Sequence, residues 1–297
     1  PQGNGGILAR WVNKDEEIRL KGNGITLFDL DIVRLYQIAS KVNCGASQEE
    51  IIEKIDIGGI SLIRAAAKNY RDVLIVPSRK EYLPLLGLLN EKLGGSDESD
   101  RKWFATRAFA VSSHYDSAIF SWFSGEDCVE RRISLHDGRE LRYGENPHQK
   151  AYFYRYRNTG SGVTLASSEV LQGKELSYNN MLDADAAWKS ACDAFHSAPH
   201  MEGRVAVSVV KHLNPCGLAV ARSLMEALEL AWAGDPVSAY GGIVCFTSLV
   251  DEQAARWFEK RFVELLIAPA FSPGALEVLA KKKNLRLLTT QIRPEKA

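Results

Sequence analysis

A lysine and a histidine follow the most regular apolar segment of this 297-residue chain. The segment from Val205 to Val210 is rich in valine and predicts a buried strand, and Lys211 and His212 come directly after it. In open α/β sheets, ligands bind beyond the carboxyl ends of the strands. A histidine beside a lysine at such a position is typical of a proton-transfer pair. The same dipeptide also fits the solvated end of a strand, so both interpretations stay open on these residues alone.

Three polar segments offer groups that could hold a ligand. Residues 141–149, LRYGENPHQ, contain Gly and Pro and predict a loop, in which the guanidinium of Arg142 suits a phosphate. Residues 176–180, LSYNN, form a second polar cluster before a helix expected at 182–195. Residues 234–242 form a loop of small residues that could donate N–H groups to a heterocycle or an anion. For the first segment, the alternative is a solvated linker.

A glycine pair, Gly58-Gly59, opens an alanine-rich segment that predicts a helix ending near Lys68. Glycines at a helix start let backbone N–H groups and the positive end of the helix dipole approach a phosphate. Asp56 lies just before the pair, and Asp56 and Lys68 could reach one ligand only if the loop folds back. The alternative interpretation is an ordinary tight turn.

Two local patterns precede this glycine pair. Residues 25–42 fit a strand or turn followed by a helix that contains Tyr36. Ser47 stands three residues before Glu50, which is the spacing of a reciprocal capping box at the start of a short helix.

The wider pattern predicts an α/β protein with two domains. Strand-like and helix-like segments alternate along the chain, which favours sheets rich in parallel strands with crossover helices. Residues 126–140 are charged and lack a sustained period. We therefore expect a domain boundary there, with one domain at 1–130 and a second at 131–297.

The composition excludes several classes of protein. Lys plus Arg and Asp plus Glu both number 37, so no overall field attracts nucleic acid or an acidic membrane. No apolar stretch is long enough to span a bilayer, and the first residues lack a signal-peptide pattern, so we expect a cytoplasmic protein. The five scattered cysteines are expected to be reduced. His212 and Cys216 lack the H-x-E and C-x-x-C spacing of zinc deaminases, and we expect no metal. Walker, dinucleotide and G-x-S-x-G motifs are absent from the sequence.

Several longer motifs resemble one known family, the bifunctional AICAR formyltransferase/IMP cyclohydrolases of purine biosynthesis. The resemblance to the formyltransferase part rests on RYGENPHQ (142–149), LSYNN (176–180), VVKHLNPCG (209–217), SAYGGI (238–243) and IAP (267–269). IDIGGISLIRAAAKN (55–69) resembles a signature of the cyclohydrolase part, and GGILAR (5–10) the end of an earlier one. The motifs occur in the family's order over nearly the whole chain.

The resemblance implies a fold and an activity. It implies a partial Rossmann-like, methylglyoxal-synthase-like cyclohydrolase domain and a cytidine-deaminase-like α/β formyltransferase domain. The implied transferase moves a formyl group from its co-substrate, 10-formyltetrahydrofolate, to AICAR, giving FAICAR. The implied hydrolase step then closes FAICAR to IMP. The family also implies a homodimer.

For the transferase, the resemblance implies that His212 takes the proton of the attacking amine, beside Lys211, which stabilises the developing charge. Arg142 and Tyr143 match nucleotide-contacting positions. Further implied substrate contacts are Asn179, Asn214, Gly241 and Glu264.

For the cyclohydrolase, the resemblance implies that Asp56 and Lys68 are active-site residues and that Gly58 is a backbone contact. Tyr36 matches the catalytic tyrosine if a one-residue gap is allowed.

Departures from the family bear on both activities. The family's N-terminal phosphate loops and its KTLHP motif have no counterpart, RLYQIAS (34–40) replaces NLYPF, and the second deaminase-like half is not represented. We therefore expect a shortened or divergent member, or a fragment. Two rivals remain: a non-catalytic nucleotide-binding relative that needs a partner to complete its sites, and a structural interaction module.

Overall fold

The computed structural model describes residues 2–10, 14–36, 42, 44–125, 129–156 and 164–292. The chain divides into two compact units. The first contains the described residues up to Ser134, together with Tyr156, and the second contains Leu135–Arg155 and the described residues from Thr164 onward. Each unit is considered separately below.

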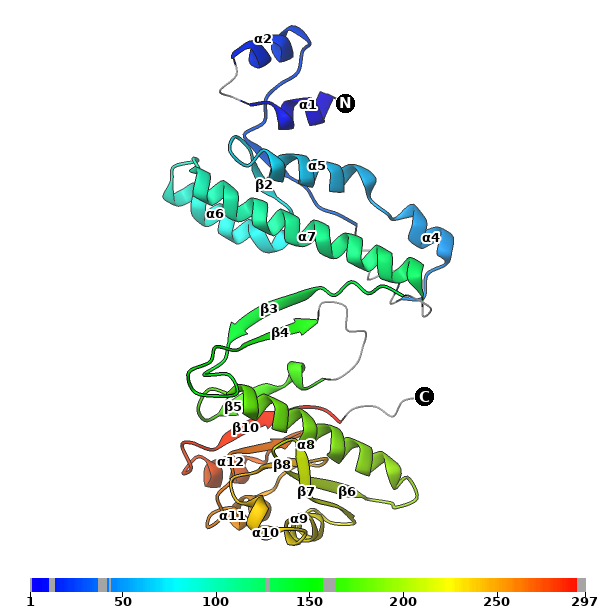
Figure 1. Ribbon diagram of the computed structural model, residues 1–297, viewed down its shortest axis with the longest axis vertical. Coiled ribbons are helices and arrows are strands. Elements are labelled where there is room, and N and C mark those ends of the chain that lie inside the picture. Colours follow the sequence, from blue (N-terminus) through cyan, green and yellow to red (C-terminus); the bar gives the residue numbers. More distant parts are fainter. Residues whose placement is uncertain are drawn as a thin grey trace. The chain divides into compact units, whose positions relative to one another are not determined.

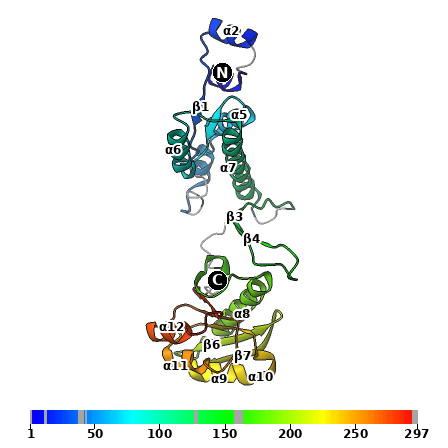
Figure 2. The same cartoon turned by 90° about the vertical axis from the view of Figure 1, so that its left-hand side faces the viewer.

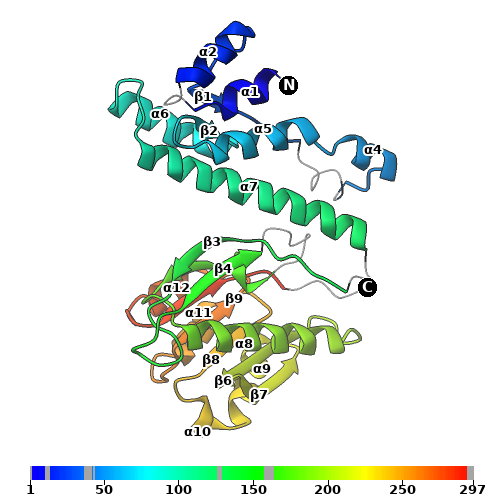
Figure 3. The same cartoon turned by 45° about the horizontal axis from the view of Figure 1, so that its top comes forward.

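The first unit places two short parallel strands among helices (Figure 1). Strand β2 contributes Ile75 to a core with α5 and α7, and its neighbour Leu74 contributes to a second core with α6 and α7. Figure 3 shows α7 running alongside α5 and α6. The elements of this unit are α1 (Gln2–Leu8), α2 (Lys14–Gly22), β1 (Leu30–Ile32), α4 (Gln48–Glu53), α5 (Ile57–Lys68), β2 (Leu74–Val76), a 3₁₀ turn (Arg79–Glu81), α6 (Tyr82–Glu91) and α7 (Glu98–Ser124).

Two local predictions for this unit have different outcomes. The capping box at α4 is confirmed, because the Ser47 side chain accepts from the Glu50 amide and the Glu50 carboxylate accepts from the Ser47 amide. The prediction that Tyr36 lies in a helix is wrong. Tyr36 lies in an irregular segment that follows β1, and the rest of the predicted helix, apart from Val42, lies outside the described residues.

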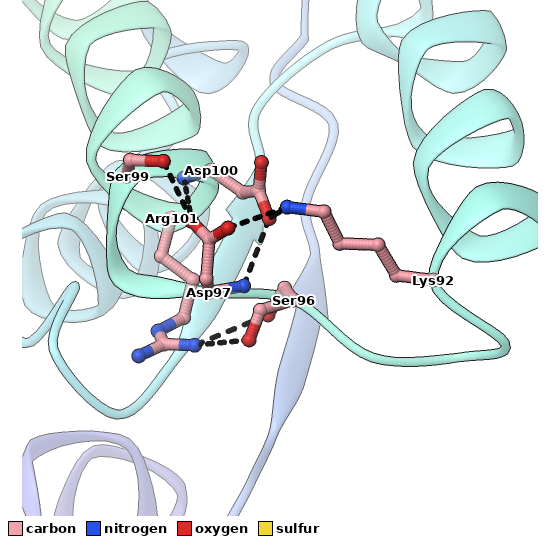
Figure 4. Close-up of polar contacts among 6 residues, drawn as sticks. All are labelled: Lys92, Ser96, Asp97, Ser99, Asp100 and Arg101. Atoms are coloured by element: carbon pink, nitrogen blue, oxygen red, sulfur yellow. Dashed lines mark hydrogen bonds and ion pairs between the residues drawn. The ribbon is translucent and has the colours of Figure 1, made fainter.

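The long helix α7 begins with a charged cap, drawn in Figure 4. Asp97 and Asp100 form a capping box, and the Lys92 ammonium lies 2.5 Å from an oxygen of each carboxylate. Arg101 donates to the Ser96 carbonyl at 2.7 Å. The hydrogen bond from Lys92 holds the pKa of the Asp97 carboxyl well below its ordinary value.

This cap gives a pH-dependent prediction. Because the pKa of Asp97 is lowered in the folded state, its contribution to stability is present above an unfolded pKa of about 3.9 and is lost as the pH falls. We expect Lys92→Gln to lower the melting temperature by at most about 4 °C near pH 7, and we expect the difference from wild type to narrow as the pH falls from 5 toward 3. Calorimetry of wild type, Lys92→Gln and the control Lys102→Gln, which changes an exposed lysine on α7, checks this prediction. An equal difference in melting temperature between wild type and Lys92→Gln at pH 3 and pH 7 would contradict it.

The second unit is built on a six-stranded mixed sheet with strand order β5-β10-β9-β8-β6-β7. A separate two-stranded sheet pairs β3 with β4. The elements of this unit are β3 (Leu135–Glu140), β4 (Tyr152–Tyr156), a 3₁₀ turn (Leu165–Ser167), β5 (Glu169–Gln172), α8 (Tyr178–Ser197), β6 (Val205–Lys211), β7 (Asn214–Ala221), α9 (Leu224–Ala233), α10 (Pro236–Ala239), β8 (Ile243–Phe246), α11 (Glu252–Trp257), β9 (Leu265–Ala268), α12 (Pro273–Leu279) and β10 (Arg286–Thr289).

Helices cover both faces of the larger sheet. On one face, α8 packs through Ala184, Ala187 and Trp188 against Ile243 and Ile267 and their neighbours. On the other face, α9, α11 and α12 pack against alternate residues of the same strands. Figures 1 and 2 show α8 on one side of the sheet and α9 and α11 on the other. The sheet is therefore buried on both faces, which explains the continuous apolar character of β6, β8 and β9.

The prediction of a parallel-rich sheet is correct for only part of this sheet. β8 pairs in parallel with β9, and β9 pairs in parallel with β10. β6 is antiparallel to both β7 and β8, and β5 is antiparallel to β10. The strand β7 was not predicted. It is an edge strand, which is where Pro215 is tolerated within a sheet.

Candidate functional site

The polar residues of the second unit lie along one edge of its larger sheet, an edge that is formed by the ends of strands and not by an edge strand. Val210, near the carboxyl end of β6, pairs with Ile243, the first residue of β8. Ile243 pairs with Leu265 at the start of β9, and Leu265 pairs with Arg286 at the start of β10. The edge therefore combines the carboxyl end of β6 with the amino ends of the parallel strands. Lys211 ends β6 and His212 follows it, as the sequence predicts, whereas Glu264 and Arg286 lie at the amino ends of β9 and β10.

His212 lies in a two-residue hairpin between β6 and β7. Lys211 pairs with Asn214 across the hairpin, and His212 and Leu213 have φ values of 54° and 67°. Positive φ at both turn residues is the geometry that favours Asn-Gly, and for other L-residues it costs roughly 1–2 kcal/mol each. The side-chain amide of Asn214 donates to the His212 carbonyl at 2.9 Å, which stabilises the turn from within the hairpin. The side chains of His212 and Leu213 are exposed.

Two contacts from outside the hairpin hold it in place. One Asp183 carboxylate oxygen accepts from the Leu213 amide at 2.7 Å, and the other accepts from the His212 amide at 3.3 Å. The Lys211 ammonium donates to the Tyr240 carbonyl at 2.9 Å. The hairpin is therefore hydrogen-bonded to α8 through Asp183 and to the segment before β8 through the Tyr240 carbonyl.

A pocket of about 420 Å³ opens beside the hairpin. Its lining residues are Lys211, His212, Asn214, Pro215, Cys216 and Ser238. Cys216 is left out of the strand pairing where the β6–β7 register shifts, and burial raises the pKa of its thiol. The thiol is therefore protonated at neutral pH, and His212 is the better candidate for a base.

Arg142 and Tyr143 lie in the loop between β3 and β4, and this loop is hydrogen-bonded to the start of α8. Tyr178 donates its amide to the Tyr143 carbonyl at 3.1 Å, and the Asn179 side chain donates to the Glu145 carbonyl at 3.1 Å. The Arg142 guanidinium donates to the Tyr143 hydroxyl at 2.9 Å and lowers the pKa of that phenol. Arg142 is exposed, so its remaining N–H groups can meet an anion from solvent.

Glu264 lies at the same sheet edge and has two polar partners, Asn180 and Arg286. One of its carboxylate oxygens accepts from the side-chain amide of Asn180 at 2.8 Å and lies 3.5 Å from the Arg286 guanidinium. The Arg286 side chain is 5% exposed, and burial lowers its pKa while Glu264 acts in the opposite direction. The buried arginine also donates to the Glu175 carbonyl at 3.2 Å, so it anchors the chain that leads into α8.

Gly241 has a structural role that limits its use as a donor. Its φ is 75°, a conformation that favours glycine, and its amide donates to the Phe262 carbonyl at 2.9 Å. This N–H is therefore already occupied within the fold.

In the first unit, two predicted residues, Asp56 and Gly58, lie at the start of α5. The Asp56 carboxylate caps the helix by accepting from the Gly59 amide at 2.7 Å, so this N–H is not free for an anion. Tyr115 of α7 is buried, and its hydroxyl accepts from the backbone amide of Asp56 at 2.7 Å. Gly58 has open space around it. Tyr36 is 62% exposed and lies beneath the Lys54 ammonium.

Lys68 lies at the other end of α5 and is not brought to Asp56. The two residues stand before and at the end of a 12-residue helix, about 18 Å apart along its axis. Asn69, directly after Lys68, is buried and donates to the Ile7 and Ala9 carbonyls at 2.8 Å each. Lys68 thus lies near the GGILAR segment rather than near Asp56.

Two residues of the second-unit site, Asp183 and Arg286, were missed by the sequence analysis, and Asn180 was included only as part of the polar segment 176–180. Asn180 and Asp183 are three apart at the start of α8, a spacing that places both on one helix face. Arg286 is the one charged residue of β10. These two signals could have identified them. Within the described residues, no group of His, Cys, Asp and Glu has a metal-binding arrangement, and no helix combines the length and apolarity needed to cross a membrane.

The motif order of the sequence is matched by a family model described as "AICARFT/IMPCHase bienzyme", which covers residues 66–297. The chain belongs to this AICARFT/IMPCHase family. The match includes every candidate residue of the second unit, whereas Tyr36, Asp56 and Gly58 precede it.

Individual relatives agree with this membership, and each is named "Bifunctional purine biosynthesis protein PurH". The protein from Bacteroides thetaiotaomicron is 46% identical over 284 residues, which are 96% of this chain and 53% of the relative. The protein from Myxococcus xanthus is 42% identical over 97% of this chain and 55% of its own. The chain spans about half the length of the curated relatives it matches. A solved structure titled "Crystal structure of ForH" is 29% identical over 40% of this chain and 62% of its own, with a TM-score of 0.34 that carries no argument.

Proposed function

We propose that this AICARFT/IMPCHase family member transfers a formyl group from 10-formyltetrahydrofolate to AICAR. The observation that carries the proposal is the gathering of Lys211, His212, Arg142, Tyr143 and Glu264 at one sheet edge. Two of these groups are cationic at neutral pH, one can act as a base, and the exposed Arg142 can receive a phosphate. Such a set suits an anionic nucleotide whose amine must lose a proton.

In the proposed reaction, the 5-amino nitrogen of AICAR attacks the formyl carbon and forms a new C–N bond. The bond from that carbon to N10 of the folate breaks, N10 takes up a proton, and the products are FAICAR and tetrahydrofolate. His212 accepts the proton of the attacking amine. Lys211, held by the Tyr240 carbonyl, supplies positive charge where negative charge develops on the formyl oxygen.

We assign nucleotide contacts to Arg142, Tyr143 and Glu264. Asn179 and Asn214 support these contacts indirectly, because their side chains hold the loop at Glu145 and the turn at His212. Gly241 supports the site through its backbone conformation.

We further propose that the first unit is related to the cyclohydrolase domain, with a methylglyoxal-synthase-like fold, and that the second unit is the first half of a cytidine-deaminase-like formyltransferase domain. The enzyme would act as a homodimer. We do not extend the proposal to ring closure of FAICAR, because Asp56 and Lys68 lie at opposite ends of α5.

A steady-state assay tests the proposed transferase. The purified chain is mixed with AICAR and 10-formyltetrahydrofolate, and tetrahydrofolate release is followed with and without AICAR. AICAR-dependent release is expected. AICAR binding without release would favour a nucleotide-binding protein, and the absence of both would favour a structural interaction module.

A further inference from the structure

The hairpin that carries His212 is held in an unfavourable conformation. His212 and Leu213 have φ values of 54° and 67°, yet neither is Gly, Asn or Asp. Histidine is found at positive φ more often than most residues, whereas a bulky leucine there is an outlier. Such conformations persist where surrounding structure determines them, and they are frequent at functional sites. Something outside the turn must therefore stabilise it.

The Asp183 carboxylate supplies that stabilisation. The strand ladder ends at the Lys211–Asn214 pair, so the amides of His212 and Leu213 lie outside it. Both amides donate to Asp183, at 3.3 Å and 2.7 Å. Hydrogen bonds from N–H groups to an ionised acceptor are stronger than those between neutral groups. One side chain thus satisfies both turn donors.

The helix that carries Asp183 is itself firmly placed. Ser177, which is buried, forms a reciprocal capping box with Asn180 at the start of α8. Asn180 also donates to Glu264, and Trp188 packs in the core beneath the sheet. Asp183 lies between these anchors, so its carboxylate is a rigid reference point for the turn.

We propose that Asp183 is a positioning residue for His212. Its two hydrogen bonds hold the left-handed turn and so fix the direction in which the imidazole meets the substrate amine. The proposal rests on the formyl transfer proposed above. It predicts that losing the carboxylate slows the reaction without weakening nucleotide binding, because Asp183 contacts the turn and is not among the nucleotide contacts.

The test compares Asp183→Asn and Asp183→Ala with a control on the same helix, Asp185→Asn. Asp185 pairs with Lys189 at the surface, so its change removes the same charge without touching the turn. We expect kcat to fall roughly 10- to 100-fold in Asp183→Ala and less in Asp183→Asn, which keeps one acceptor oxygen, with AICAR affinity changed less than about threefold. Asp185→Asn should match wild type. Wild-type kcat in Asp183→Ala, or equal losses of kcat and AICAR affinity, would overturn the proposal.

Hydrogen exchange separates failure of this proposal from failure of the proposed reaction. In the full chain, exchange of the Leu213 amide is expected to quicken at least about tenfold in Asp183→Ala and less in Asp183→Asn, with exchange along β6 unchanged. This measurement needs no turnover and also detects a variant that fails to fold, in which β6 would exchange faster as well. If the wild type shows no formyl transfer, the proposed reaction is wrong; unchanged Leu213 exchange in the folded Asp183→Ala variant overturns the proposed positioning of His212.

Discussion

Replacing His212 with alanine is expected to lower kcat for formyl transfer about 10²- to 10⁴-fold, because a positioned general base contributes about that much. AICAR affinity should change little, because the base acts mainly in the transition state. The side chain is exposed and lies at the tip of a hairpin, so its removal leaves the core packing of β6 intact.

His200→Ala is the matched control for this change. His200 is an exposed histidine of the same unit, in the turn that follows α8, and the site described above does not include it. Its variant should show wild-type kcat. A His212→Ala enzyme that loses AICAR binding and turnover in equal measure would mean that His212 binds the nucleotide rather than acting as a base.

Replacing Arg142 with leucine is expected to weaken AICAR binding about 100-fold. The guanidinium is exposed, and one of its N–H groups is directed to the Tyr143 hydroxyl. Hydrogen bonds to a phosphate are charge-assisted, and each contributes about 1.5–3 kcal/mol. Loss of a bidentate contact accounts for the expected change.

Comparison of AICAR with its riboside, which lacks the phosphate, sharpens this test. Wild type should bind AICAR far more tightly than the riboside, and Arg142→Leu should remove most of that preference. Arg155→Leu, which changes an exposed arginine of β4, should keep it. Calorimetric titration measures the two affinities of each of the three proteins; an unchanged preference for AICAR in Arg142→Leu would show that the phosphate lies elsewhere.

Local patterns were sufficient to predict several elements. The capping box at Ser47 and the helix after Asp56 depend on neighbouring residues, and both occur as expected. The valine-rich strand β6 is buried along its apolar residues, as its composition predicts. At these places the local preference and the fold agree.

The remaining features depend on contacts between residues distant in the sequence. The hairpin after β6 was missed because His212-Leu213 lacks the usual turn residues, and the turn is held by Asp183, 30 positions before Leu213. The composition of β6 does not reveal that it runs antiparallel to both β7 and β8, because this orientation depends on its pairing with those strands. Arg286 reaches the Glu175 carbonyl, 111 positions earlier. Conversely, Asp56 and Lys68 are close in the sequence but lie at opposite ends of α5, so the fold keeps them apart.

The central claim is that the sheet edge around the Lys211–His212 hairpin transfers a formyl group to AICAR. The most direct measurement is a single turnover with enzyme in excess and 10-formyltetrahydrofolate labelled in the formyl carbon. After chromatography, the account predicts label in FAICAR with wild type and with His200→Ala, and at least about 100-fold slower labelling with His212→Ala. Label that stays on folate in the wild-type reaction, or that reaches AICAR equally fast without His212, would contradict the claim.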